Sequence, residues 1–326
     1  MVSGSRDARL IEAVQGQGLQ YDLSVGAFGL GGGFSRLAED CEGEARRWFG
    51  SGCPSDPRMR SERLARIQEM AHTPGVRAVM LDGARFASFA SSEGVESFFT
   101  CFCPTCLRAA EEMGFDSGRM REGARALRRF TQTGEGDAEA ALRGVGEWMA
   151  FREESVSRFL GDFVRAVHAA GKLAGAFVFA PSLSGWVGQK RAGACGLDVL
   201  APMVYRRYPH ADGPACLNHE WAALLCLLTE KTGLSRGEAA RLVNAPTLAA
   251  DVLADGFSCG QVSREVEALA AEGRAYRLSP ILQREDDRLT QSIRAAERAG
   301  ADEVGLFAFD RMDNMPDLRA LGEEAQ

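Results

Sequence analysis

Short apolar runs alternate with longer segments of helical periodicity from one end of the chain to the other, and this alternation restricts the fold more than any other feature. Repeated strand and helix units of this kind build a parallel sheet with helices packed outside it. Six strands are predicted, at 21–28, 76–81, 173–180, 199–205, 276–282 and 304–308. The sequence therefore predicts an α/β fold of the (β/α)8 TIM-barrel type.

A helical insertion is expected between the fourth and fifth of these strands. Residues 207–275 contain helical patterns at 220–228, 236–244 and 264–272, and Ser235 and Ser263 are predicted to cap the last two. Other helices are predicted at 8–18, 91–99, 106–113 and 144–170. Insertions at the carboxyl ends of barrel strands commonly shape a substrate cleft, so this segment is expected to lie over the barrel mouth.

The size and composition of the chain favour a single domain spanning residues 1–326. Of the 326 residues, 45% are hydrophobic and 25% are charged, which is enough to bury one large core. The net charge is −7, and Lys and Arg do not cluster with aromatic residues, which argues against a nucleic-acid partner. The chain lacks an apolar run long enough to span a bilayer, which argues against a membrane partner.

The compartment is inferred from the start of the chain and from its cysteines. The first residues lack the basic and then apolar layout of a secretory signal. Nine cysteines, an odd number, favour a reducing compartment over a disulfide framework. The sequence predicts a soluble, cytoplasmic protein and leaves open whether it forms a homo-oligomer.

Four cysteines give the strongest chemical signal in the chain. Cys101, Cys103 and Cys106 lie in the run TCFCPTC, and Cys53 lies upstream in GCPSDP. Three thiolates within six residues can bind one ion, and Cys53 would complete a tetrahedral zinc site. A closed site of this kind is structural, because no coordination position stays open for water. The alternatives are buried reduced thiols and a CxxC redox pair.

A carboxylate, Asp82, directly follows the predicted strand at 76–81 and is the best catalytic candidate. Catalytic side chains in β/α barrels project from the carboxyl ends of the strands. Arg85, three residues later, can hold this carboxylate ionised or bind a substrate hydroxyl. The alternative is an ion pair between Asp82 and Arg85 that only orders the loop.

Other polar and aromatic side chains follow the later strands and suit a carbohydrate better than a phosphate ester. Aromatic faces stack on pyranose rings, while amides and phenols hydrogen-bond to sugar hydroxyls. The predicted substrate-binding residues are Arg85, Trp186, Gln189, Tyr205 and Gln283. For Trp186 and Tyr205, a packing role with the polar tip satisfied is an equal alternative.

Cys53 in CPSDP and the three cysteines of CFCPTC together resemble the zinc-bearing β-galactosidases of the glycoside hydrolase superfamily. That resemblance covers the first third of the chain and implies a structural zinc held by Cys53, Cys101, Cys103 and Cys106. Four further motifs are similar to uncharacterised TIM-barrel glycoside hydrolases related to that superfamily. They are LDGARF, the WxxFR pattern of 148–152, APMVY at 201–205 and SPILQRED at 279–286.

The resemblance also implies a register, in which 76–81 is the fourth barrel strand. The β-galactosidases carry an Asn-Glu pair at the end of that strand, where this chain has Leu81 and Asp82, so Asp82 is either the acid or the nucleophile. Glu285 follows the seventh strand, where the family nucleophile lies, and Asp310 and Glu220 are rivals for that role. In this register the first one or two β/α units have no residues, and the chain is expected to be an incomplete or reduced barrel.

Two function classes follow from these observations. The first is a glycoside hydrolase in which two carboxylates, Asp82 and Glu285, flank the scissile bond. The second is a catalytically silent barrel that binds carbohydrate or acts as a scaffold. A zinc-dependent hydrolase is disfavoured, because no His or carboxylate accompanies the cysteines.

Overall fold

A computed structural model describes residues 2–4, 6–29, 37–48, 51–91, 94–207, 216–246, 255–271 and 273–307. At its centre is an eight-stranded parallel sheet in the order β1-β2-β5-β6-β7-β9-β10, with β8 pairing with β7 beside β9. The strands are β1 (Val2–Gly4), β2 (Tyr21–Gly26), β5 (Val76–Asp82), β6 (Leu173–Phe179), β7 (Val199–Met203), β8 (Arg277–Leu278), β9 (Ile281–Gln283) and β10 (Gly305–Phe307). A separate antiparallel pair joins β3 (Ala38–Glu39) to β4 (Ala45–Arg46).

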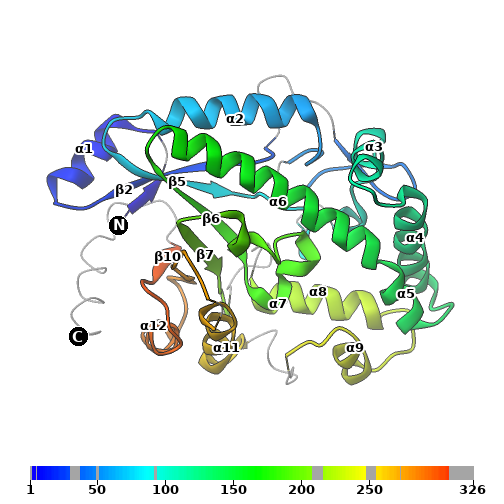
Figure 1. The fold of residues 1–326 in the computed structure, drawn as a ribbon. Helices are drawn as coiled ribbons and strands as arrows, with labels where there is room; N and C mark the ends of the chain where they lie inside the picture. The colour runs from blue at the N-terminus through cyan, green and yellow to red at the C-terminus, as the bar shows by residue number, and fades with distance from the viewer. Residues whose placement is uncertain are drawn as a thin grey trace.

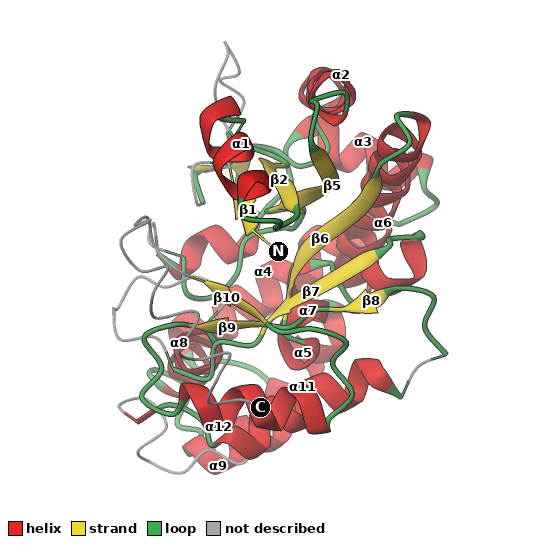
Figure 2. Cartoon of the chain, turned by 90° about the vertical axis from the view of Figure 1, so that its left-hand side faces the viewer, coloured by secondary structure: helices red, strands yellow, loops and turns green. Residues whose placement is uncertain are grey.

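The sheet curls into a partial barrel (Figure 2). Because β8 and β9 share one position next to β7, the eight strands fill seven positions. Within the described residues, no strand joins β10 to β1, so the sheet is a curled half-barrel with two open edges.

All six predicted strands are present, the fifth of them interrupted between β8 and β9. The sequence left open whether one or two early β/α units are missing, and β1 fills one of the two early strand positions. β1 pairs in parallel with β2, with Val2 opposite Tyr21 and Gly4 opposite Leu23. Three residues that include Ser and Gly give no apolar run, so this strand carries no pattern that periodicity could detect.

The two faces of the sheet bury very different amounts of apolar surface. The outer face packs against the helices in one extensive core that includes Leu23, Val79 and Leu81. The inner face holds only a small cluster, in which Met80, Val199 and Ala201 are buried. Since side chains alternate between the faces of a strand, the small inner set leaves the interior of the half-barrel incompletely filled.

Helices α1 (Ala8–Gly16), α2 (Pro57–Ala71) and α6 (Gly146–Ala169) cover the outer face near β2, β5 and β6, and α2 and α6 run side by side in Figure 1. Four aromatic residues of α6 are fully buried in the core: Trp148, Phe151, Phe159 and Phe163. The helix predicted at 8–18 is confirmed as α1. The motif PSDP starts α2 because Asp56 caps the amides of Arg58 and Met59 and Pro57 occupies the first turn.

Between β5 and β6 lie the short 3-10 helix η1 (Val95–Phe99), α3 (Pro104–Glu112), α4 (Ser117–Thr133) and α5 (Ala138–Gly144). The predictions at 91–99, 106–113 and 144–170 correspond to η1, α3 and α6. After β6 come α7 (Pro181–Ser184), η2 (Gly185–Val187) and η3 (Ala192–Cys195), and α12 (Leu289–Arg298) joins β9 to β10. No helix among the described residues is both long enough and apolar enough to cross a membrane.

The insertion between β7 and β8 is helical, as predicted, with α8 (Leu217–Thr229), α9 (Arg236–Leu242) and α11 (Cys259–Ala270). Ser235 caps α9 in a reciprocal capping box with Glu238. The predicted start after Ser263 is wrong, because α11 begins at Cys259 with Ser258 as its N-cap. Ser263 lies inside the helix, where its hydroxyl donates to the carbonyl of Ala295 at 3.2 Å.

Candidate functional site

The concave side of the half-barrel contains a cavity of about 510 Å³. It extends from the middle of the strands to their carboxyl ends, and its lining contains no Lys, Arg or His among the described residues. The residues that line it are Gly4, Asp22, Ser24, Met80, Asp82, Phe177, Ala201, Met203, Tyr205, Ser279, Ile281, Gly305, Leu306 and Phe307. A mixed wall of apolar, hydroxyl and carboxyl groups of this volume can accommodate a small organic ligand.

Asp82 is the last residue of β5 and lines this cavity. Its side chain is half-buried, and burial raises the pKa of the carboxyl group, while the Arg85 charge and the Gly83 amide oppose the shift. A carboxylic acid with a raised pKa can stay protonated closer to neutral pH and donate a proton to a bound ligand.

Arg85 is buried beneath this loop rather than in the cavity wall. Its guanidinium lies 5.1 Å from the ring centre of Trp48 and 4.7 Å from that of Phe179. Burial lowers the pKa of Arg85, and the charges of Glu220 and Asp82 oppose that shift. The positive charge of Arg85 therefore interacts with two carboxylates, Glu220 and Asp82, and not with Asp82 alone.

Glu220, in the first turn of α8, is buried, and its Oε2 accepts a hydrogen bond from the Ala90 amide at 3.0 Å. This contact fixes the loop after β5 to the first helix of the insertion. Glu220 does not line the cavity.

Gln189 joins the ends of two neighbouring strands. Its Oε1 accepts from the Phe179 amide at 2.8 Å, and its Nε2 donates to the Ala84 carbonyl at 3.1 Å. Both polar atoms of this buried side-chain amide therefore bind backbone groups, and one of them, the Ala84 carbonyl, lies two residues after Asp82.

The two predicted aromatic residues lie in different places. Tyr205 lines the cavity and stacks on Phe307, with ring centres 5.5 Å apart. Trp186 is absent from the cavity lining and packs edge-on against Phe89 and Phe98. The structure brings Asp82 and Tyr205 to one cavity and places Trp186 in the aromatic core behind it.

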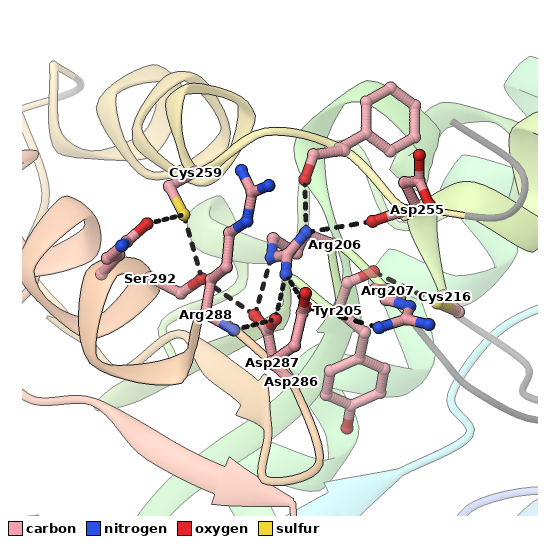
Figure 3. A network of polar contacts seen from close by, with 12 residues as sticks. Tyr205, Arg206, Arg207, Cys216, Asp255, Cys259, Asp286, Asp287, Arg288 and Ser292 are labelled. Atoms are coloured by element: carbon pink, nitrogen blue, oxygen red, sulfur yellow. Dashed lines mark hydrogen bonds and ion pairs between the residues drawn. The ribbon is translucent and has the colours of Figure 1, made fainter. Parts of the chain in front are cut away.

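A buried polar network holds the loops after β7 and β9 together (Figure 3). Arg206 donates to Asp286 through Nε at 2.9 Å and through Nη2, and Nη2 also contacts Asp287. Asp286 further accepts from Ser292 Oγ at 2.9 Å and from the Arg288 amide at 3.0 Å. Sequence reasoning missed this network, since its partners lie about eighty positions apart along the chain.

The predicted residues after β9 lie outside the cavity lining. Gln283, the last residue of β9, is buried, and Glu285 is exposed in the following turn, next to Asp286 of the network. Asp310 falls outside the described residues.

Asp22 is a second cavity carboxylate that sequence reasoning missed. It pairs with Arg77, through Nε at 2.9 Å and Nη2 at 2.6 Å. Asp22 stands opposite Ala78, four residues before Asp82 on β5, which puts it about 13 Å below the level of Asp82. The Asp22 carboxylate is engaged by Arg77, which makes Asp82 the better candidate of the two for acid–base chemistry. The ion pair at the base of the cavity is structural.

The four predicted metal ligands come together as a buried cluster, termed here the four-cysteine cluster: Cys53, Cys101, Cys103 and Cys106. Their sulfur atoms all lie within 4.8 Å of one another, and Cys53 Sγ is 3.4 Å from both Cys103 Sγ and Cys106 Sγ. Tetrahedral zinc with bonds of about 2.3 Å separates its sulfurs by about 3.8 Å, so the arrangement fits such an ion. None of the four forms a disulfide.

Local structure explains why these thiols meet. Pro104 starts α3, which makes Cys103 its N-cap and puts Cys106 in its first turn. Hydrogen bonds from Cys101 and Cys106 hold the pKa of Cys103 well below its usual range, and burial raises the pKa of Cys106. The cluster joins the loop after β2, which carries Cys53, to the loop after β5.

A curled parallel sheet with helices outside, and with a carboxylate at a strand end that faces a cavity, defines a partial (β/α) barrel. No known protein family and no curated protein matches the sequence. Among solved structures, the chain is similar to the PgaB (BpsB) glycoside hydrolase domain from Bordetella bronchiseptica. The TM-score is 0.55 at 14% identity, with 93% of this chain and 74% of that chain covered. The chain therefore shares its overall fold with that domain.

A GH20 exo-β-N-acetylglucosaminidase from Vibrio harveyi, solved in complex with N-acetylglucosamine, also matches, at 12% identity and a TM-score of 0.32. That match covers 65% of this chain and 32% of the other.

Proposed function

We propose that this protein is a glycoside hydrolase whose active site is the cavity at the carboxyl ends of the strands. The observation that carries the proposal is Asp82, a half-buried carboxyl with a raised pKa at a strand end, facing a cavity of sugar-sized volume. The glycoside hydrolase fold of the PgaB domain supports the same interpretation. The position is the one from which barrel enzymes present catalytic groups.

In this proposal Asp82 is the general acid, which protonates the leaving glycosidic oxygen. Glu285, in the turn after β9, is the proposed second carboxylate, which attacks the sugar or activates water. Glu220 is the weaker rival, because its buried carboxylate is engaged by the Ala90 amide.

The proposed substrate contacts divide into two groups. Tyr205 meets the sugar directly, since its ring forms part of the cavity wall. Arg85, Trp186, Gln189 and Gln283 are proposed to shape the wall and orient the strand ends. A carbohydrate fits this wall, which offers aromatic and hydroxyl groups and, among the described residues, no cation that would hold a phosphate ester.

The four-cysteine cluster is proposed to hold a structural zinc ion, as the resemblance to the zinc-bearing β-galactosidases implies. Four thiolate ligands leave no position for water, so the ion would fold the two loops together and take no part in hydrolysis. Its contribution to the site is indirect, through the loop that follows Asp82.

A panel of aryl glycosides tests the catalytic proposal. The wild-type protein is expected to release the aryl group from at least one glycoside, and Asp82→Asn is expected to lose at least about 100-fold in kcat/KM. The Asp22→Asn variant is the matched control in the same cavity, and it should lower stability more than turnover per folded molecule. Equal turnover by the wild type and Asp82→Asn removes Asp82 from the mechanism.

The second candidate is a carbohydrate-binding barrel without catalysis. It is favoured by the exposed position of Glu285, which does not line the cavity with Asp82. A barrel that only binds carbohydrate would be stabilised against heat by sugar and would release no product from any glycoside. A Tyr205→Ala variant would lose this stabilisation.

A further inference from the structure

Arg152, in α6, is a fully buried cation with an unusual environment. Its Nε donates to the Thr100 carbonyl at 3.2 Å, and Nη1 donates to the Trp186 carbonyl at 2.8 Å. Nη2 donates to the carbonyls of Phe98 and Thr100. The guanidinium also lies 4.1 Å from the ring centre of Trp148. Carbonyl dipoles and aromatic faces surround it on all these sides.

No carboxylate contacts Arg152 in the described part of the chain, and its carbonyl partner Thr100 directly precedes Cys101 of the four-cysteine cluster. Burying a charge without an opposite charge is expensive, and buried guanidiniums are therefore normally paired. The four-cysteine cluster therefore lies beside a buried cation that no carboxylate among the described residues balances.

A second cation, Arg60 of α2, flanks the cluster on another side. Its Nε donates to the Pro54 carbonyl at 2.7 Å, and its Nη2 donates to the Ser155 hydroxyl and carbonyl, both at 2.8 Å. Pro54 directly follows Cys53, so Arg60 is bound to the backbone of the cluster. Helices α6 and α2 thus each place one guanidinium against a carbonyl next to a cysteine of the four-cysteine cluster.

We infer that Arg152 and Arg60 are the counter-ions of a doubly negative centre made of four thiolates and one divalent cation that prefers sulfur ligands. Four thiolates carry a charge of −4, the cation reduces it to −2, and the two guanidiniums bring the buried ensemble to zero. The inference rests on the proposed metal centre and extends it by assigning the residues that balance its charge.

The assignment has a structural consequence beyond the metal. Arg152 Nη1 holds the Trp186 carbonyl in η2, and the nearby Phe86 amide donates to the Val187 carbonyl at 3.0 Å. Removing the metal leaves Arg152 as an uncompensated buried cation, so the loop after β6 should loosen together with the cluster. The metal would then stabilise the contact between the loops after β5 and β6, across α6 and through Arg152.

Metal retention tests the inference without any assay of catalysis. The metal content of purified protein is measured first, and then the rate at which the native protein releases its metal to an excess of a chromogenic chelator. Arg152→Met is expected to release metal at least about 10-fold faster than wild type, because partners just outside a metal's ligands change its affinity by about 10- to 100-fold. Arg152→Lys keeps the charge and should fall between them.

Arg129→Met, which removes an exposed arginine from α4, is the control and should match the wild type. If Arg152→Met does not fold, Arg60→Met and Arg152→Lys carry the test, and both are expected to release metal faster than wild type. Release at the wild-type rate from folded Arg152→Met, or from both of the other two variants, overturns the inference while leaving the metal centre intact. A folded wild-type protein without metal overturns the metal centre itself.

Discussion

Replacing Asp286 by Asn removes the negative charge at the centre of the network that joins the loops after β7 and β9. The side chains of Arg206 and Asp286 are only 2% and 3% exposed. Asp286 accepts from Arg206, Ser292 and the Arg288 amide, so the variant keeps the shape of the carboxylate and loses its charge. The perturbation therefore isolates a buried ion pair at the edge of the candidate site.

Breaking a buried pair by removing one partner costs about 3–5 kcal/mol, because the other charge is left uncompensated. Here Asp287 also contacts Arg206 Nη2 and can carry part of the compensation, which points to the lower end, about 3 kcal/mol. Asp287 is 50% exposed, so Asp287→Asn should cost less than about 1 kcal/mol and is the matched control.

Urea denaturation followed by circular dichroism measures both losses. With a slope of about 3 kcal/mol per molar urea, Asp286→Asn should lower the midpoint by about 1 M, and Asp287→Asn by less than about 0.3 M. Equal losses for the two variants would refute the reasoning, as would a loss below about 1 kcal/mol for Asp286→Asn. The same variant should weaken sugar binding, because Tyr205 and Glu285 directly precede the paired residues.

Three further predictions concern single side chains. Asp82→Asn should be more stable than wild type at pH 7, because a carboxyl group with a raised pKa destabilises the folded state once it is ionised. This difference in stability should disappear as the pH falls toward 3.8, and thermal unfolding between about pH 4 and 8 measures it. Glu285→Gln should lower glycosidase turnover at least about 100-fold without loss of stability. Glu220→Gln should instead lower the free energy of unfolding in urea by about 1–3 kcal/mol, because it weakens the buried contact with the Ala90 amide. Gly175→Ala should cost about 1–3 kcal/mol, because its new Cβ would clash with Met80 Sδ, and adding Met80→Ala should recover part of that loss.

The sheet could be predicted from the sequence where its strands are buried on the helical side. A parallel strand such as 76–82 or 173–179 is a nearly continuous apolar run, which periodicity detects. β1 could not be predicted, since its three residues gain their strand character only by pairing with β2. The predicted start of α11 was misplaced because Ser263 suggests an N-cap by residue type alone, whereas in the fold Ser258 is the N-cap and the Ser263 hydroxyl donates to the Ala295 carbonyl.

The position of a candidate site residue could be predicted where the residue type and its place in the sequence were enough to locate it. Asp82 and the four-cysteine cluster follow from residue type and spacing, and both lie where the sequence puts them. The environment of a side chain could not be predicted in the same way. Trp186 and Tyr205 have similar sequence contexts at strand ends, yet only Tyr205 faces the cavity, because the fold of the loop after β6 turns Trp186 toward Phe89 and Phe98.

Within the described ranges the sheet lacks the hydrogen bonds that close a full barrel, and buried polar contacts connect its strand-end loops. The four-cysteine cluster joins the loops after β2 and β5, and Gln189 joins β5 to β6. Glu265 of α11 accepts from the Ser182 amide after β6 at 2.9 Å, and Arg206 with Asp286 joins β7 to β9. Each contact connects one pair of loops, so each can be removed by a separate substitution. Asp82 and Tyr205, which line the cavity, lead directly into two of these loops. Loss of metal should therefore disturb the β2 and β5 side of the cavity before the β7 and β9 side.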